Sequence, residues 1–212
     1  MISIMLTNGL ESCRQIIYDN SEISLRRSVP KIETPFKCYI YCSLIDSKRF
    51  MHSLFSKFGE YEAVRIWNSE NWSGLKGKVI GEFICDEVYT WTYNDNTERY
   101  DIKVDDANRF NLHSHDLFEY GKGNLLRGLH ITNLKIYDTP RSITEFGYIC
   151  SSFDTCENCD NCDYHYYSNT PSSGIEEACT CDGVKTLKRA PRSWCYVEEL
   201  DKDRIAEEAR FI

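Results

Sequence analysis

The feature that most constrains the fold is a series of short runs rich in aromatic and β-branched residues, with helix-like segments between some of them. Runs of this composition are typical of β-strands. Helices do not separate them in the regular alternation of a parallel βαβ sheet, so their order favours an α+β chain built as a small mixed β-barrel. The predicted strands cover residues 23–26, 36–44, 77–88, 129–137 and 193–200.

Apolar residues at helical spacing predict a few helices that flank these strands. Residues 9–18 carry apolar side chains every three or four positions, and Thr7 and Asn8 precede them as candidate N-cap residues. Further helices are predicted over residues 48–58, 111–120 and 202–209.

The composition is that of a folded chain without a membrane helix. The 212 residues are 42% hydrophobic and 27% charged, which suits one large domain or one domain that carries an insertion. No apolar run approaches the roughly 18 residues of a membrane helix. The apolar patch within residues 1–10 lacks the basic segment of a secretory leader. We therefore expect a cytoplasmic protein.

The net charge of -8 is unevenly distributed. Residues 1–60 carry a small basic excess, whereas the later parts of the chain are acidic. Non-specific binding to DNA or RNA over a large surface is therefore not expected, because such surfaces are basic over most of their area. Two local basic stretches remain as candidate binding sites or as ordinary solvated surface: residues 26–31 (RRSVPK) and 188–192 (KRAPR).

The cysteines indicate a metal site. Eleven cysteines in a chain without a leader point to reduced thiols, and residues 156–181 combine five closely spaced ones with few apolar residues. Thiolates at such spacings bind zinc tetrahedrally, and the bound metal orders a segment that has little core of its own. An iron–sulfur cluster or unliganded thiols remain alternatives. A structural zinc ion would take four of the five, or His165 in place of one: Cys156, Cys159, Cys162, Cys179 and Cys181.

These patterns divide the chain into a barrel and an insert. The barrel is predicted to comprise residues 1–149 and 185–212, and the zinc-binding insert residues 150–184. The cysteines outside the insert lie mostly in apolar segments, where a thiol behaves as a small buried hydrophobic group. His130, inside a predicted strand, is either a satisfied core histidine or a polar group that points into a cleft.

Several of these segments resemble a known family. Residues 21–31 (SEISLRRSVPK) follow a helix and precede a strand, as does the signature of ASCH-domain proteins, which belong to the PUA-like β-barrel superfamily. The runs KIETPFKCYIYC, GKVIGEFICDEV, LHITNLKIYDTP and APRSWCYVEEL are similar to short ASCH-like proteins of phages and prophages. The resemblance implies a PUA-like mixed barrel, encoded by a phage or another mobile element and located in the cytoplasm of a bacterial host.

The family motif G-x-K-x-x-E-x-R is degenerate in this chain. Its positions are occupied by Asp19, Ser21, Ser24 and Arg26, so only the arginine is retained. In members that hydrolyse acylated nucleosides, the resemblance implies that the motif lysine activates a hydroxyl nucleophile. Ser24 and Glu82 are therefore only weak catalytic candidates. A lysine recruited from elsewhere would restore the base, and the candidates are Lys31, Lys37 and Lys78.

The resemblance favours a non-catalytic binding module. It would bind RNA, a nucleotide or a nucleoprotein complex at a cleft, where Trp67, Trp72 and Trp91 are candidates to stack on bases. The expected ligand-binding residues are Arg26, Arg27, Lys31 and His130.

Two alternatives come from other functional classes. One is a phage-encoded inhibitor of a host defence complex, similar in role to an anti-CRISPR protein. It would act by protein contact or by acidic mimicry of nucleic acid, through residues 154–182 and 198–203. The other is an amidohydrolase that acts on acylated nucleosides.

The zinc site is testable without a structure. The purified chain is expected to contain about one zinc ion per chain by elemental analysis, because a closed site of four thiolates holds one metal ion. A content below about 0.2 zinc ions per chain would show that the predicted zinc site does not exist.

Overall fold

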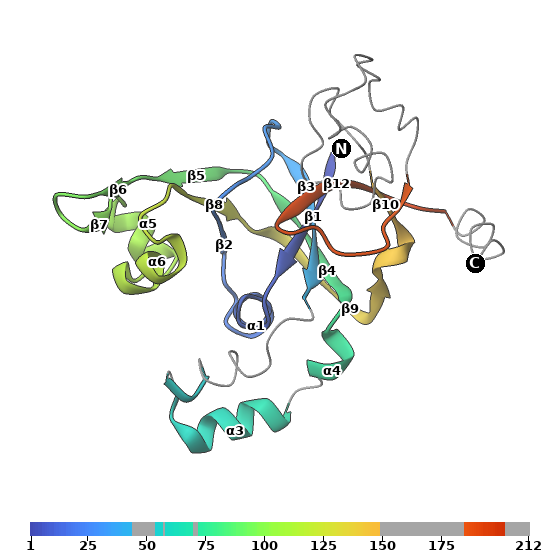
Figure 1. Ribbon diagram of the computed structural model, residues 1–212, viewed down its shortest axis with the longest axis horizontal. Helices are drawn as coiled ribbons and strands as arrows, with labels where there is room; N and C mark the ends of the chain where they lie inside the picture. Colours follow the sequence, from blue (N-terminus) through green and yellow to red (C-terminus); the bar gives the residue numbers. More distant parts are fainter. Residues whose placement is uncertain (44–53, 57, 70–71, 149–184, 202–212) are drawn as a thin grey trace, which may run out of the picture.

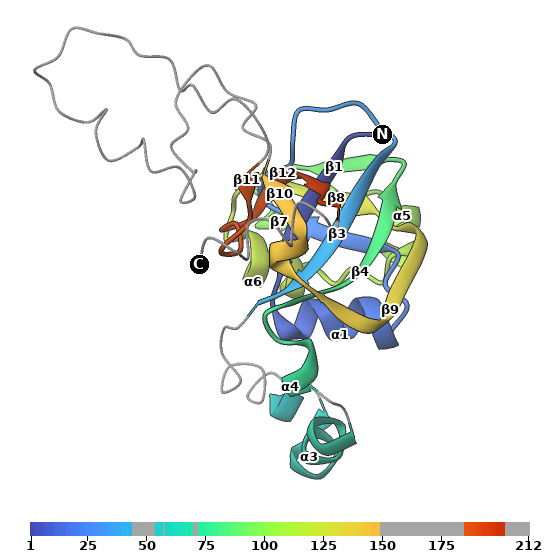
Figure 2. The ribbon, with the colours of Figure 1, turned by 90° about the vertical axis from the view of Figure 1, so that its right-hand side faces the viewer.

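A mixed seven-stranded sheet forms the centre of the molecule (Figures 1 and 2). The computed structural model describes residues 1–43, 54–56, 58–69, 72–148 and 185–201. The strand order is β11-β10-β12-β1-β3-β4-β9, in which only β1 and β3 run parallel. The strands are β1 (Ser3–Asn8), β3 (Phe36–Cys42), β4 (Lys78–Cys85), β9 (Thr132–Ser142), β10 (Phe146–Tyr148), β11 (Lys185–Thr186) and β12 (Trp194–Glu199).

A second, three-stranded antiparallel sheet lies beside the first and completes a half-barrel with it. Its order is β2-β8-β5, with β2 at Ile23–Arg26, β8 at Leu126–His130 and β5 at Val88–Trp91. A short hairpin of β6 (Tyr93–Asn94) and β7 (Arg99–Tyr100) follows β5. The helices are α1 (Leu10–Tyr18), α3 (Glu60–Ser69), α4 (Trp72–Leu75), α5 (Val104–Arg109), α6 (Ser114–Gly121) and a 3-10 turn at Ile143–Glu145.

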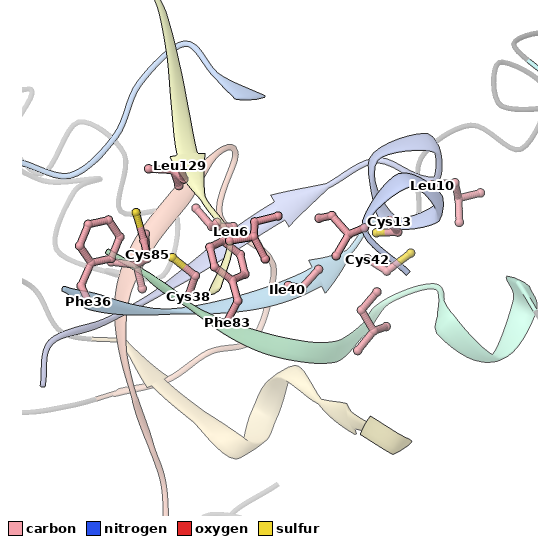
Figure 3. Packing of buried hydrophobic residues seen from close by; sticks show 14 of the residues in the cluster. Leu6, Leu10, Cys13, Phe36, Cys38, Ile40, Cys42, Phe83, Cys85 and Leu129 are labelled. Carbon is pink, nitrogen blue, oxygen red and sulfur yellow. The ribbon is translucent and has the colours of Figure 1, made fainter. Parts of the chain in front are cut away.

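The alternation of side chains along β3 separates two cores. Cys38 and Ile40 face the main core, which also receives α1 and Leu129 of the three-stranded sheet (Figure 3). Tyr39 and Tyr41 face the other side of the sheet and pack in a second core with residues of β10 and β12. A third core joins the three-stranded sheet to α5, α6 and the β6–β7 hairpin. Both faces of β3 are therefore covered, as its nearly continuous apolar sequence requires.

The cysteines of the described segments lie where the sequence predicted small buried groups. Cys13, Cys38, Cys42 and Cys85 are fully buried in the main core (Figure 3), and Cys195 is half-buried. Burial raises the pKa of Cys38 well above its usual range, and raises that of Cys85 to about 12. These two thiols therefore stay protonated and pack as hydrophobic groups.

The structure confirms the predicted α+β architecture and most of its elements. The predicted strand over residues 23–26 and the helix over 9–18 correspond to β2 and α1. Two local predictions are wrong. Thr7 and Asn8 end β1 rather than cap α1, whose N-cap is Gly9 without a side-chain hydrogen bond. The run over residues 129–137 spans two strands, because the chain leaves β8 after His130 and enters β9 in the other sheet.

The two strands that flank the predicted insert lie next to each other. β10 and β11 flank residues 149–184 and pair directly, with Gly147 opposite Thr186 and Tyr148 opposite Lys185. The division into barrel and insert stays a prediction, as does the terminal helix over residues 202–209, since both concern residues outside the described segments. No helix within the described segments is long and apolar enough to cross a membrane.

Leu129 provides a test of the junction between the two sheets. Its side chain is fully buried in the main core, whereas Leu134 on β9 is 37% exposed. We expect Leu129→Ala to lower the free energy of unfolding by about 2–5 kcal/mol, because it leaves a cavity between the sheets. Leu134→Ala is the matched control, with an expected loss below about 1 kcal/mol. Urea unfolding measures both, and equal losses would contradict the placement of Leu129.

Candidate functional site

Arg26 is a buried cation that joins the two sheets. Its side chain leaves β2 and reaches the end of β1, and only 5% of the residue is exposed. One terminal nitrogen donates to the backbone oxygen of Thr7 at 2.7 Å. The other donates to Asn8 Oδ1 and, at 3.3 Å, to Ser24 Oγ. All of these acceptors are neutral oxygens. The Nε–H of Arg26 has no hydrogen-bond partner in the structure.

The electrostatic environment of Arg26 is unfavourable for its charge. Burial lowers the pKa of this guanidinium. Within the described part of the chain, no carboxylate forms an ion pair with it. A buried cation normally has an anionic partner, since removing it from water without one costs several kcal/mol.

A second arginine lies directly opposite Arg26. In the register of β2 and β8, Arg26 is paired with Arg127, which is in turn paired with Thr90 on β5. Cross-strand partners project from the same face of a sheet with their Cβ atoms about 4.5–5.5 Å apart. The three side chains therefore form one row. Burial decreases along it, from buried Arg26 through half-buried Arg127 to exposed Thr90.

The two basic stretches identified in the sequence are connected through Thr7 of β1. Thr7, the acceptor for Arg26, donates from its hydroxyl to the backbone oxygen of Pro191 at 2.6 Å. Its backbone N–H donates to Ser193 at 2.9 Å. The indole N–H of Trp194 donates to Ser28 Oγ at 3.3 Å. These bonds connect the segment before β12 with β1 and with the segment after β2.

Arg27 has a structural role at the end of α6. Its Nε and one terminal nitrogen both donate to the backbone oxygen of Tyr120, at 3.1 and 2.7 Å. The guanidinium also lies 5.6 Å from the centre of the Tyr120 ring. A cation at the C-terminus of a helix satisfies a free carbonyl and interacts favourably with the helix dipole. Lys31, the last residue of the same basic stretch, is exposed.

His130 lies on the opposite face of the three-stranded sheet from Arg26. Its ring is close to those of Tyr89 and Phe110, which belong to the third core and its border. Nδ1 is 2.7 Å from Asp86 Oδ1, and Nε2 is 2.9 Å from a terminal nitrogen of Arg109. Both ring nitrogens are thus engaged. The residues predicted as one ligand cleft are divided between two faces of the sheet, with Arg26 on the inner face and His130 on the outer one.

Of the tryptophans proposed for base stacking, the one whose side chain is described does not lie beside Arg26. Trp91 is 3% exposed and packs in the third core. A Cβ atom at Gly128 would lie only 2.6 Å from its ring, so the backbone of β8 passes directly over it. The side chains of Trp67 and Trp72 lie outside those that the structure describes. An aromatic side chain that does lie near Arg26 is Tyr120, which interacts with it electrostatically and is 37% exposed.

The weak catalytic candidates Ser24 and Glu82 lie on different faces of the fold. Ser24 is buried beside Arg26 on the main-core side. Glu82 is paired with Tyr39, which faces the second core. It accepts from Lys37 at 3.1 Å and from Tyr137 at 2.6 Å.

Among the described lysines, none supplies a base to Ser24. Lys37 is engaged by Glu82, and Lys31 and Lys78 are exposed. No interaction with Ser24 is formed by any of the three.

A hollow of about 700 Å³ lies on the second-core side of the sheet, beside Lys37, Tyr39 and Glu199. Glu199 accepts from Tyr39 at 2.7 Å and pairs with Arg141 at 3.1 Å. Burial alone would raise the pKa of Glu199, but the hydrogen bonds from Tyr39 and Arg141 outweigh it and lower the pKa. The negative charge of Glu199 is therefore balanced by Arg141.

The predicted zinc ligands Cys156, Cys159, Cys162, Cys179 and Cys181 lie outside the described residues. The segments that are described contain no cluster of three or more histidine, cysteine or acidic side chains able to hold a metal ion. The zinc site therefore stays a prediction from the sequence.

No protein-family model and no curated protein matches the chain. Among solved structures, it is similar to the ASCH protein of Zymomonas mobilis, with 10% identity over 98% of this chain and 94% of that one, at a TM-score of 0.40. A point mutant of the same protein gives 11% identity over 98% and 96% of the two chains, at a TM-score of 0.42. ASCH structures are thus among those that this chain resembles. These values assign it no activity, ligand or site residue.

Proposed function

We propose that this chain is a non-catalytic ASCH-like module that binds RNA or a nucleotide through phosphate groups. The observation that carries the proposal is the convergence of residues 26–31 and 188–192. They are far apart in the sequence and are brought together through Thr7, Ser28 and Trp194. A local basic surface binds phosphates even on an acidic protein, because the interaction is screened beyond about 10 Å at ordinary salt.

The hydroxyl nucleophile and the carboxylate that hydrolysis would need are separated. Ser24 and Glu82 lie on opposite sides of the seven-stranded sheet, which argues against a shared acid–base site. Binding without turnover is the simpler function for this arrangement. The zinc-stabilised insert at residues 150–184 and an origin in a phage remain parts of the proposal that rest on the sequence.

The inhibitor of a host defence complex is the alternative, with a nucleoprotein complex as the partner. Its acidic surface would come from residues 154–182, outside the described segments, and from residues 198–203. Of the latter, Glu199 already pairs with Arg141. The described contacts therefore favour phosphate binding over acidic mimicry.

Salt dependence of RNA binding tests the proposal. A short fluorescein-labelled single-stranded RNA is titrated with the full chain at several salt concentrations, with fluorescence anisotropy as the readout. For single strands, each phosphate contact contributes about 0.7 to the slope of log affinity against log salt. Lys31 and Lys188 are exposed members of the two stretches. The double variant Lys31→Gln/Lys188→Gln is therefore expected to reduce the slope by about 1.4.

Lys103→Gln serves as the control, because Lys103 is equally exposed but lies before α5, outside both stretches. Its slope should equal that of the unmodified chain. A nucleoside monophosphate added as competitor separates the two ligand classes. Full displacement of the labelled RNA identifies a nucleotide as the ligand, whereas RNA that stays bound identifies RNA as the ligand. Absence of binding to both, or an unchanged slope in the double variant, would refute the proposal.

A further inference from the structure

The row formed by Arg26, Arg127 and Thr90 carries two positive charges, and no carboxylate of the described segments pairs with either of them. Arg26 is hydrogen-bonded only to neutral oxygens, and its Nε–H is buried and unpartnered. Arg127, opposite it, forms no hydrogen bond or ion pair with any described residue. Like charges placed directly opposite in a sheet destabilise it. The two arginines therefore lower the stability of the folded chain, and a purely structural role for Arg26 does not explain why both are present.

Burial decreases along the row towards one edge of the three-stranded sheet. Its inner end is the buried guanidinium of Arg26, and its outer end is Thr90 on β5, an exposed residue on the edge strand of the three-stranded sheet. Arg127 lies between them and is half-buried. A ligand that approached from this edge would meet the hydroxyl of Thr90 first, then the half-buried guanidinium of Arg127, and finally the buried one of Arg26.

We infer that Arg26, Arg127 and Thr90 form a binding site for a phosphate monoester, such as the terminal phosphate of an RNA or the phosphate of a nucleotide. The inference rests on the proposed function and specifies the phosphate that is bound most deeply. A monoester carries a charge of about -1.5 to -2 at neutral pH and so matches two guanidinium groups. A phosphodiester carries a single charge.

Enclosure also favours the monoester over the diester. The inner end of the row is closed by Thr7, Asn8 and Ser24, which hold the two terminal nitrogens of Arg26. An internal phosphodiester bound to Arg26 would have to place a sugar on both sides of the phosphate, close to these three residues. A terminal phosphate needs only one connection to the outside, and its oxygens accept the forked donors of arginine well.

Inorganic phosphate is the simplest probe of this site. Thermal unfolding of the full chain is measured with millimolar phosphate and with sodium chloride at the same ionic strength. A ligand that binds the folded state raises the Tm, so phosphate should raise it more than chloride does. In Arg127→Gln this difference should disappear, because one of the two cations is lost, whereas Arg127→Lys should retain part of it.

The control variant is Arg99→Gln, which changes an exposed arginine on the β6–β7 hairpin. It should keep the full difference between phosphate and chloride. An equal difference in Arg127→Gln and in the unmodified chain would overturn the site. The substitution is made at Arg127 rather than Arg26, because Arg26 also ties β2 to β1 and its loss affects folding.

A second measurement separates this inference from the proposed function. Affinities are compared for one single-stranded RNA with a 5′-phosphate and for the same RNA with a 5′-hydroxyl, together with a 3′-phosphorylated form. The site predicts about tenfold tighter binding of a terminally phosphorylated form, which corresponds to about one charge-assisted contact. This preference should be lost in Arg127→Gln. Binding of all three forms with one affinity would refute the monoester site and leave the proposed function standing. Absence of binding to every RNA form and to a nucleoside monophosphate would refute both.

Discussion

The buried guanidinium of Arg26 is the interaction on which both the fold and the candidate site depend. It is the point at which the short sheet of β2, β8 and β5 is tied to the end of β1 in the large sheet, through Thr7 and Asn8. The tie uses backbone and amide oxygens rather than a carboxylate, so it orients the group without neutralising it. The same contacts that join the two sheets therefore leave a positive charge inside the molecule, close to a second one on Arg127.

The two faces of the three-stranded sheet carry different groups. The inner face holds the row from Arg26 to Thr90, while the outer face packs against α5 and α6 and carries His130 with Asp86. Arg27 follows Arg26 in the sequence but points to the outer face, where it caps α6. The two neighbouring arginines therefore differ in role: Arg26, the last residue of β2, ties the two sheets together, whereas Arg27, just after the strand, contacts α6.

The sequence was informative where local patterns decide the structure. The limits of β2 and the placement of Arg26 in it were predictable from alternation and from the retained motif position. The end of β1 was not, because Thr7 and Asn8 are good cap residues. They belong to a strand only because their backbone pairs with β3, and because Thr7 also bonds to Ser193 on the other side. The break after His130 was also hidden, since the alternation continues without interruption from one sheet into the other.

Arg127 could not be assigned from the sequence alone. Its signal was an arginine within the otherwise largely apolar run LLRGLH, but its importance depends on the register that places it opposite Arg26. Thr90 likewise gains its place only through the pairing of β5 with β8. The grouping of His130 with Arg26 fails for the same reason. The strand of His130 was recognised, but the sheet pairing sets the face to which its side chain points.

The most direct test of the central claim is the resonance of the Arg26 Nε–H group, followed by NMR during a titration with inorganic phosphate. If this proton is the free donor of an anion site, its signal shifts and saturates with the phosphate concentration in the unmodified chain, and it stays unchanged in Arg127→Gln. An Arg26 signal that is insensitive to phosphate in the unmodified chain would mean that the guanidinium only ties the two sheets together, and would contradict the account.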